Sequence, residues 1–262
     1  MRIVTFASGS SGNCALISER GTHLLIDAGI SMRRISCCLK DFGITPGQLS
    51  GVLITHEHSD HICGLGTMLK KYDMPLYAPR AAAEYLKWNV AGAADVLRVI
   101  VPGETVEVGN VSVTPFRTMH DTPESVGYRI EGDSAVGFCT DLGCVTDEVR
   151  TALTGVDAAV IEANHDEDML RYGPYPVQLK RRILSDHGHL SNECSGGLAV
   201  FLAEHGTKYI VLGHLSRENN TPLKARSAVA EALEHAEKRA DLAVAPASGY
   251  MELLVGRAAE MC

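Results

Sequence analysis

Residues 56–61 read HEHSDH and place three histidines and two carboxylates in six positions, directly after the apolar run GVLIT. Residues two apart on a strand point to the same side, so His56 and His58 can face one ion as the strand ends. Asp60 and His61 fall on the turn into the next helix and can face a second ion. Imidazole and carboxylate at this density are ligands for Zn²⁺, Mn²⁺ or Fe. A solvated polar turn is the alternative interpretation, but four such groups after a buried strand favour metal.

Two ions need more ligands, and three further strand ends offer them. His120 follows VSVTPFRTM, Asp141 follows SAVGFCT, and His214 follows KYIVLG. Each alone has a simpler interpretation, as a loop residue, a turn former or a neighbour of a helix cap. Together with HEHSDH they predict one dinuclear site.

Composition sets the class of protein. The chain has 262 residues, 45% hydrophobic and 21% charged, which suits a single globular domain over residues 1–262. No apolar stretch approaches the roughly 18 residues of a membrane span, and MRIVTFASGSSG is interpreted as a first strand rather than a signal peptide. We therefore expect a cytoplasmic protein with no membrane association. Nothing in the sequence supports an oligomer.

Charge and cysteine usage agree with this picture. The eight cysteines include no Cys-x-x-Cys pair, which favours free thiols in a reducing compartment. The net charge of -8 argues against a protein that coats nucleic acid nonspecifically. It leaves room for an enzyme that holds a few phosphates in a local basic pocket.

The elements that must position these residues follow from periodicity and turn signals. Strands are expected at 2–6, 14–18, 23–27, 51–55, 75–79, 98–102, 105–109, 111–116, 126–131, 134–141, 157–164, 208–216 and 242–255. Helices are expected at 64–72, 80–89, 146–154, 176–185, 191–206 and 221–240. Ser191 is a predicted N-cap, Gly206 a C-terminal stop, and Pro222 a first-turn residue. The order predicts an α/β fold of two β-rich layers, each followed by helices.

These phrases resemble a known family. HEHSDH, His120 before GYRI, TDLG and GHLS resemble the metallo-β-lactamase-fold hydrolases. The phrases ASGSSGNC, LIDAG, EANHD and LKRRILSDHGHLSN resemble the YycJ/WalJ-type branch, bacterial proteins treated as DNA exonucleases. The resemblance covers essentially the whole chain.

The resemblance implies a fold and a set of roles. The fold would be an αββα four-layer sandwich, classed as α/β or α+β, with metals at one edge of two sheets. His56, His58 and His120 would hold one ion and Asp60, His61 and His214 the other, with Asp141 between them. Asp27 would orient ligands from behind the cluster.

Two cations would make water reactive near neutral pH, with Asp60 and Asp141 as the acids that support its activation. His189 is the candidate to protonate the leaving group, with Glu162 orienting it. A helix-capping role is the alternative for His189. His187 is a weaker candidate, and Cys63 and Cys139 are interpreted as ordinary thiols.

Substrate contacts are predicted from position. His165 is assigned to substrate or to support of the site, and the run Lys180, Arg181 and Arg182 to phosphate contact. A charge run is usually a solvated helix face, which is the alternative here. The loop SGSSGN lacks the spacing and the following helix of a dinucleotide site.

The leading hypothesis is a dinuclear phosphodiesterase acting on DNA, a 5′-to-3′ exonuclease with two divalent ions, Zn or Mn, with Fe as another option. A small-molecule hydrolase of a cyclic phosphodiester, thioester, lactone or β-lactam is the second hypothesis. A metal-stabilised regulatory module with little turnover is the third, and a redox diiron protein is a further option.

Overall fold

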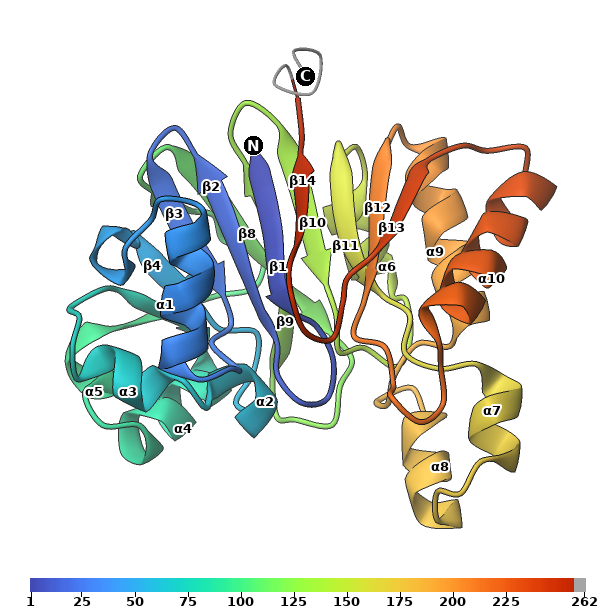
Figure 1. Ribbon diagram of the computed structural model, residues 1–262, viewed down its shortest axis with the longest axis horizontal. Helices are drawn as coiled ribbons and strands as arrows, with labels where there is room; N and C mark the ends of the chain where they lie inside the picture. Colours follow the sequence, from blue (N-terminus) through green and yellow to red (C-terminus); the bar gives the residue numbers. More distant parts are fainter. Residues whose placement is uncertain (257–262) are drawn as a thin grey trace.

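The computed structural model describes residues 1–256. Two seven-stranded sheets pack face to face, and helices cover the outer face of each (Figure 1). This is the four-layer sandwich that the family resemblance implies. The predicted single domain over 1–262 remains a prediction, and residues 257–262 lie outside the described residues.

The first sheet has the strand order β14-β1-β2-β3-β4-β5-β6. Its strands are β1 Arg2–Ala7, β2 Cys14–Glu19, β3 Thr22–Ile26, β4 Gly51–Leu53, β5 Leu76–Pro79, β6 Leu97–Ile100 and β14 Met251–Leu254. The helical segments between β3 and β6 are α1 Met32–Asp41, η1 Pro46–Gln48, α2 Ser59–Ile62, α3 Leu65–Leu69, α4 Arg80–Asn89 and α5 Ala93–Val96. Strands β3 to β6 run parallel.

The second sheet has the order β13-β12-β11-β10-β9-β8-β7. Its strands are β7 Val106–Val108, β8 Val111–Thr118, β9 Ser125–Glu131, β10 Ala135–Cys139, β11 Ala158–Glu162, β12 Tyr209–Gly213 and β13 Asp241–Val244. Its helices are α6 Asp147–Leu153, α7 Glu167–Tyr172, α8 Val177–Ile183, α9 Asn192–Glu204 and α10 Pro222–His235. Strands β10 to β13 run parallel, and β8 points the same way because β9 is antiparallel to both β8 and β10.

Alternation along the strands builds three apolar layers. In β3, Leu24 packs between the two sheets, whereas the next residue, Leu25, packs under the helices of the first sheet. In β11, Val160 faces the inter-sheet layer and Ile161 faces α9 and α10. Each sheet is thus buried on both faces, which explains why its strands read as apolar runs.

Most predicted elements are confirmed, including the N-cap at Ser191, whose hydroxyl accepts a hydrogen bond from the Cys194 amide at 3.2 Å. The predictions were incomplete in two respects. Helices α1, α2, α5 and α7 were not predicted, although in α1 Met32, Ile35 and Leu39 bury one face. The closing segment 242–255 was predicted as one stretch of strand character, but it forms β13 in the second sheet and β14 in the first.

Within residues 1–256, no helix combines the length and hydropathy that a membrane span requires.

Candidate active site

The site lies where strands of both sheets end. His56 follows β4, His120 follows β8, Asp141 follows β10 and His214 directly follows β12. Because β8, β10 and β12 point the same way, their carboxyl ends share one edge of the second sheet, where open α/β sheets bind ligands. The loop after β4 brings HEHSDH to this edge from the first sheet.

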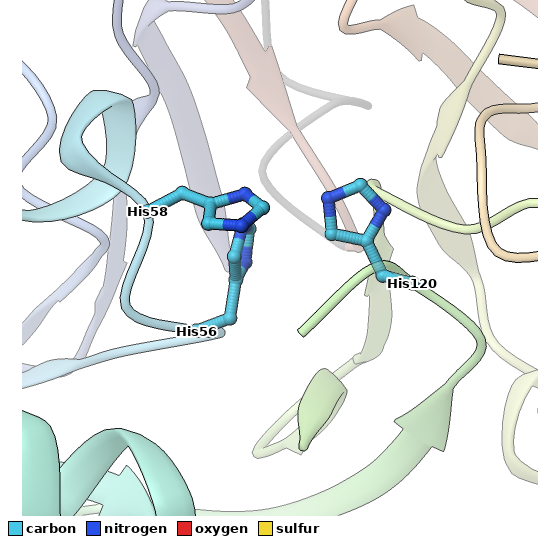
Figure 2. A group of neighbouring side chains, drawn as sticks. All are labelled: His56, His58 and His120. Carbon is cyan, nitrogen blue, oxygen red and sulfur yellow. The ribbon is translucent and has the colours of Figure 1, made fainter. Parts of the chain in front are cut away.

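One group of side chains is formed by His56, His58 and His120. Each offers a ring nitrogen, and these nitrogens lie within 4.8 Å of one another. Figure 2 shows the three imidazoles facing a common space, two from the loop after β4 and one from the loop after β8. The ring centroids of His56 and His120 are 5.0 Å apart.

A second group adjoins the first. Asp60, His61 and His214 also place ligand atoms within 4.8 Å of one another. Asp141 lies between the groups: its carboxylate oxygens are 3.5 Å from His61 Nε2, 3.4 Å from His214 Nε2 and 3.9 Å from His120 Nε2. The structure therefore brings all seven predicted ligands together.

Buried hydrogen bonds behind the rings fix their orientation. Asp27 Oδ2 accepts from His61 Nδ1 at 2.7 Å, and Thr55 donates its amide to Asp27 Oδ1 at 2.9 Å. The Thr55 hydroxyl lies 3.0 Å from His56 Nδ1. Burial raises the pKa of Asp27 although its contacts with His61 oppose the rise. Asp27 thus has the contacts expected of an acid that orients ligands.

Glu162 holds two imidazoles with one oxygen. Its Oε1 lies 2.7 Å from His189 Nδ1 and 2.8 Å from His214 Nδ1, and its Oε2 accepts from the amides of Leu142 and Leu190. Burial alone would raise the pKa of Glu162, but the two histidines hold it at about 2. An ionised carboxylate only accepts, so both rings donate through Nδ1 and leave Nε2 for the site.

The pKa values of the buried histidines in the cluster are shifted in opposite directions. Burial drives the pKa of His56 well below its usual value. At His61, burial acts in the same direction but the carboxylates of Asp141 and Asp27 overcome it and raise the pKa to about 10. Burial likewise opposes charge on Asp141, yet His214 and His61 hold its pKa well below the usual range.

The donor set fits divalent metal. His56 Nε2, His214 Nε2 and Asp141 Oδ2 are buried and have no hydrogen-bond partner among residues 1–256. Buried polar atoms are rarely left unpaired, and three in one cluster of ligand side chains are what a cation-binding site would present. Neutral imidazole and carboxylate are suitable ligands for such a cation.

Strained backbone coincides with the site. Asp27, Asp141 and His214 adopt φ values of 59°, 61° and 54°. Non-glycine residues seldom occupy this left-handed region, which costs of order 1–3 kcal/mol each. All three directly follow strand ends or lie within two residues of one, where a sharp turn aims the carboxylate or imidazole inward.

Two side chains of the site were missed by sequence reasoning. Asp121 Oδ1 lies 3.2 Å from His120 Nε2, and its other oxygen forms an ion pair with Arg182. Asn13 Nδ2 lies 3.0 Å from His61 Nε2 and donates to Asp60 Oδ2 at 3.3 Å. The signal for Asp121 was its position beside His120, whereas Asn13 gave none because its loop is 47 residues from Asp60.

The predicted substrate residues differ in how they are placed relative to the candidate active site. Lys180 and Arg181 lie on α8, and Arg182 reaches the site through Asp121. His165 is 1% exposed, and within the described part of the chain neither ring nitrogen has a hydrogen-bond partner. Burial lowers the pKa of His165 to about 4. This position does not support direct contact with substrate. His187 lines a cavity of about 410 Å³ beside His120, with Arg80 and Arg117.

Comparisons with known proteins agree with this geometry. A family model described as a β-lactamase superfamily domain matches residues 22–215. The chain is 38% identical to exodeoxyribonuclease YycJ of Bacillus anthracis over 232 residues, 87% of each chain. It is 38% identical to exodeoxyribonuclease WalJ of Streptococcus pneumoniae over 235 residues, 88% of this chain and 87% of that one. Zn²⁺-bound PqqB from Methylobacterium extorquens superposes with a TM-score of 0.74 at 20% identity, covering 97% of this chain and 100% of PqqB.

Proposed function

Because the chain belongs to the β-lactamase superfamily, in the branch of YycJ and WalJ, we propose that it is a metal-dependent exonuclease that hydrolyses DNA. The observation that carries the proposal is the convergence of seven ligand side chains, spread from His56 to His214, on one sheet edge. The two relatives named above are exodeoxyribonucleases by name, and this chain matches 87% of the length of each.

The residues divide into two ligand groups in the proposal. His56, His58 and His120 would hold one divalent ion, and Asp60, His61 and His214 would hold the other, with Asp141 available to both groups. Zn or Mn bound there would supply Lewis-acid chemistry that activates water and offsets charge on a phosphoryl group. The buried hydrogen bonds of Asp27 and Thr55 hold the imidazoles of His61 and His56 in place for this task.

His189 is the proposed acid for the leaving oxygen. Its side chain is 17% exposed, so a substrate can reach it. Its ring lies 5.1 Å from the ring of His120 and 5.2 Å from that of His214. Glu162 fixes the Nδ1 proton of His189 and leaves Nε2 to hold the proton that the departing alkoxide needs.

Phosphates beyond the scissile one are assigned to Lys180, Arg181 and Arg182. They lie on α8, and Arg182 contacts Asp121 beside His120. The cavity of about 410 Å³ that His120 helps to line is of a size that accommodates a nucleotide. A 5′-to-3′ direction and a cytoplasmic location remain predictions.

The test incubates purified protein with Mn²⁺ or Zn²⁺ and duplex DNA labelled at either end. Progressive shortening of a 3′-labelled strand from its 5′ end, lost in Asp60→Ala and kept in the exposed control Asp73→Ala, supports the proposal. Turnover of bis(p-nitrophenyl) phosphate with intact DNA would replace it with a small-molecule hydrolase. Bound metal without turnover of either substrate would replace it with a regulatory module.

A further inference from the structure

Helices α7 and α8 form an arm, residues 167–183, that projects past the sheets (Figure 1). Leu170 is the buried residue of α7, and α8 has no buried residue. A helix that buries nothing contributes little to the apolar core, because helix stability in proteins comes mainly from packing one face. The exposed faces of the arm therefore call for a role other than packing.

The arm exposes a large aromatic ring. Tyr172, the last residue of α7, is 86% exposed, and Val177, the first of α8, is 63% exposed. The Lys180 ammonium donates to the carbonyl of Arg171 at 2.8 Å, which places a cation one residue from Tyr172. An apolar ring with a neighbouring cation presents both kinds of group that bind a nucleotide.

Charge on the arm is opposite to that of the rest of the chain. Residues 167–183 carry four basic side chains against two acidic ones, whereas the whole protein has a net charge of -8. Arg171 is paired with Glu167 at 2.8 Å. Lys180 and Arg181 have no ion-pair partner among residues 1–256. A local excess of positive charge beside an exposed ring favours a polyanion with planar bases.

One end of this surface, the C-terminal end of α8, is tied to the candidate active site by two contacts. Arg182 forms an ion pair with Asp121, whose other oxygen is 3.2 Å from His120 Nε2. At the end of α8, the amide of His189 donates to the carbonyl of Ile183 at 3.0 Å. A strand that leaves the site can therefore pass from Arg182 along α8 toward Lys180, which contacts the carbonyl of Arg171 beside Tyr172.

We propose that the α7–α8 arm binds a single-stranded segment of the nucleic acid substrate. Lys180, Arg181 and Arg182 contact successive phosphates, and an unpaired base stacks on Tyr172. Stacking needs an unpaired base, so the arm selects a frayed or overhanging end over a closed duplex. The inference rests on the proposed exonuclease function and adds the form of the substrate.

The test measures binding of a fluorescent single-stranded oligonucleotide of about 12 nucleotides with phosphorothioate linkages to the metal-loaded full chain. Tyr172→Ala is expected to weaken binding about tenfold, and Tyr172→Phe to keep it, because the ring is retained. Trp88→Ala, which removes a ring 78% exposed on α4, is the matched control and is expected to bind like wild type. Arg181→Ala is expected to reduce the dependence of log affinity on log salt by about 0.7.

Two failures are distinguishable. Equal binding by Tyr172→Ala and wild type, while wild type still shortens DNA, overturns the arm and leaves the exonuclease proposal standing. Failure of wild type to shorten DNA overturns both. The metal content and unfolding midpoint of each variant are also measured, and wild-type values show that the fold and the metal site are intact.

Discussion

Replacing Glu162 by glutamine tests the hydrogen-bond network most directly, because one buried carboxylate serves four donors. Its Oε1 accepts from His189 and His214, and its Oε2 from the amides of Leu142 and Leu190. A glutamine has one oxygen and one NH₂ group. Whichever way the amide turns, its NH₂ faces two donors and leaves them without an acceptor.

The magnitude follows from those two orphaned donors. Each costs about 1–3 kcal/mol when buried, so the metal-free variant should lose about 2–6 kcal/mol of unfolding free energy. At roughly 2–4 °C per kcal/mol, the unfolding midpoint falls measurably. Loss of the contact with His214 should lower metal affinity about 10–100-fold. DNA hydrolysis should fall further, because His189 also loses its orienting partner.

Calorimetry, metal-affinity measurement and the DNA assay on one preparation check the expected losses of stability, metal affinity and hydrolysis. The matched control is Glu131→Gln, which removes the same charge from a half-exposed ion pair with Arg129 and should change stability by at most about 1 kcal/mol. Wild-type metal content together with wild-type hydrolysis in Glu162→Gln would refute the assignment of Glu162 to both rings.

Three further predictions concern the metals and their loop. Asp27→Asn removes the charged acceptor of His61 Nδ1 and should lower metal affinity about 10–100-fold in a competition assay with a chelating dye; unchanged affinity would contradict it. Dialysis against EDTA should abolish hydrolysis and lower the unfolding midpoint, and added Zn²⁺ or Mn²⁺ should restore both; full activity in protein shown to be metal-free would end the dinuclear hypothesis. Gly29→Ala places a Cβ 1.6 Å from the Asp60 carbonyl oxygen, so this variant should displace the HEHSDH loop and lower metal content. Gly197→Ala is the control and should bind metal normally, because its Cβ meets no atom of residues 1–256 within 4 Å. Equal metal content in the two variants would show that the loop tolerates the shift.

The sequence predicts which side chains converge at the site because their chemistry is local. His56 to His61 stand together after an apolar strand, and His120, Asp141 and His214 each end a run of alternating or continuous apolar residues. Parallel strands bring their carboxyl ends to one edge, so the order of elements already places these residues near one another. The side chains that hold the rings, such as Thr55, were harder to predict, because a threonine in a strand has an ordinary interpretation.

What the sequence could not predict depends on partners distant in the chain. The segment 242–255 is mostly apolar, and nothing in its composition indicates that β13 pairs with β12 while β14 pairs with β1 in the other sheet. Helix α1 did carry a signal, since Met32, Ile35 and Leu39 have helical spacing after the N-cap Ser31. Its polar residues and the adjacent cysteines Cys37 and Cys38 obscured that spacing. The burial of His165 depends on packing that no local pattern reports.

The left-handed backbone at Asp27, Asp141 and His214 has a consequence for directed evolution of a more heat-stable protein. Glycine adopts that conformation without penalty, so a selection for heat resistance alone should enrich glycine at these positions. Each such replacement would discard a carboxylate or imidazole of the metal cluster. Variants obtained by that selection would be more heat-stable but catalytically inactive. A library designed for thermal stability should therefore keep these three codons fixed.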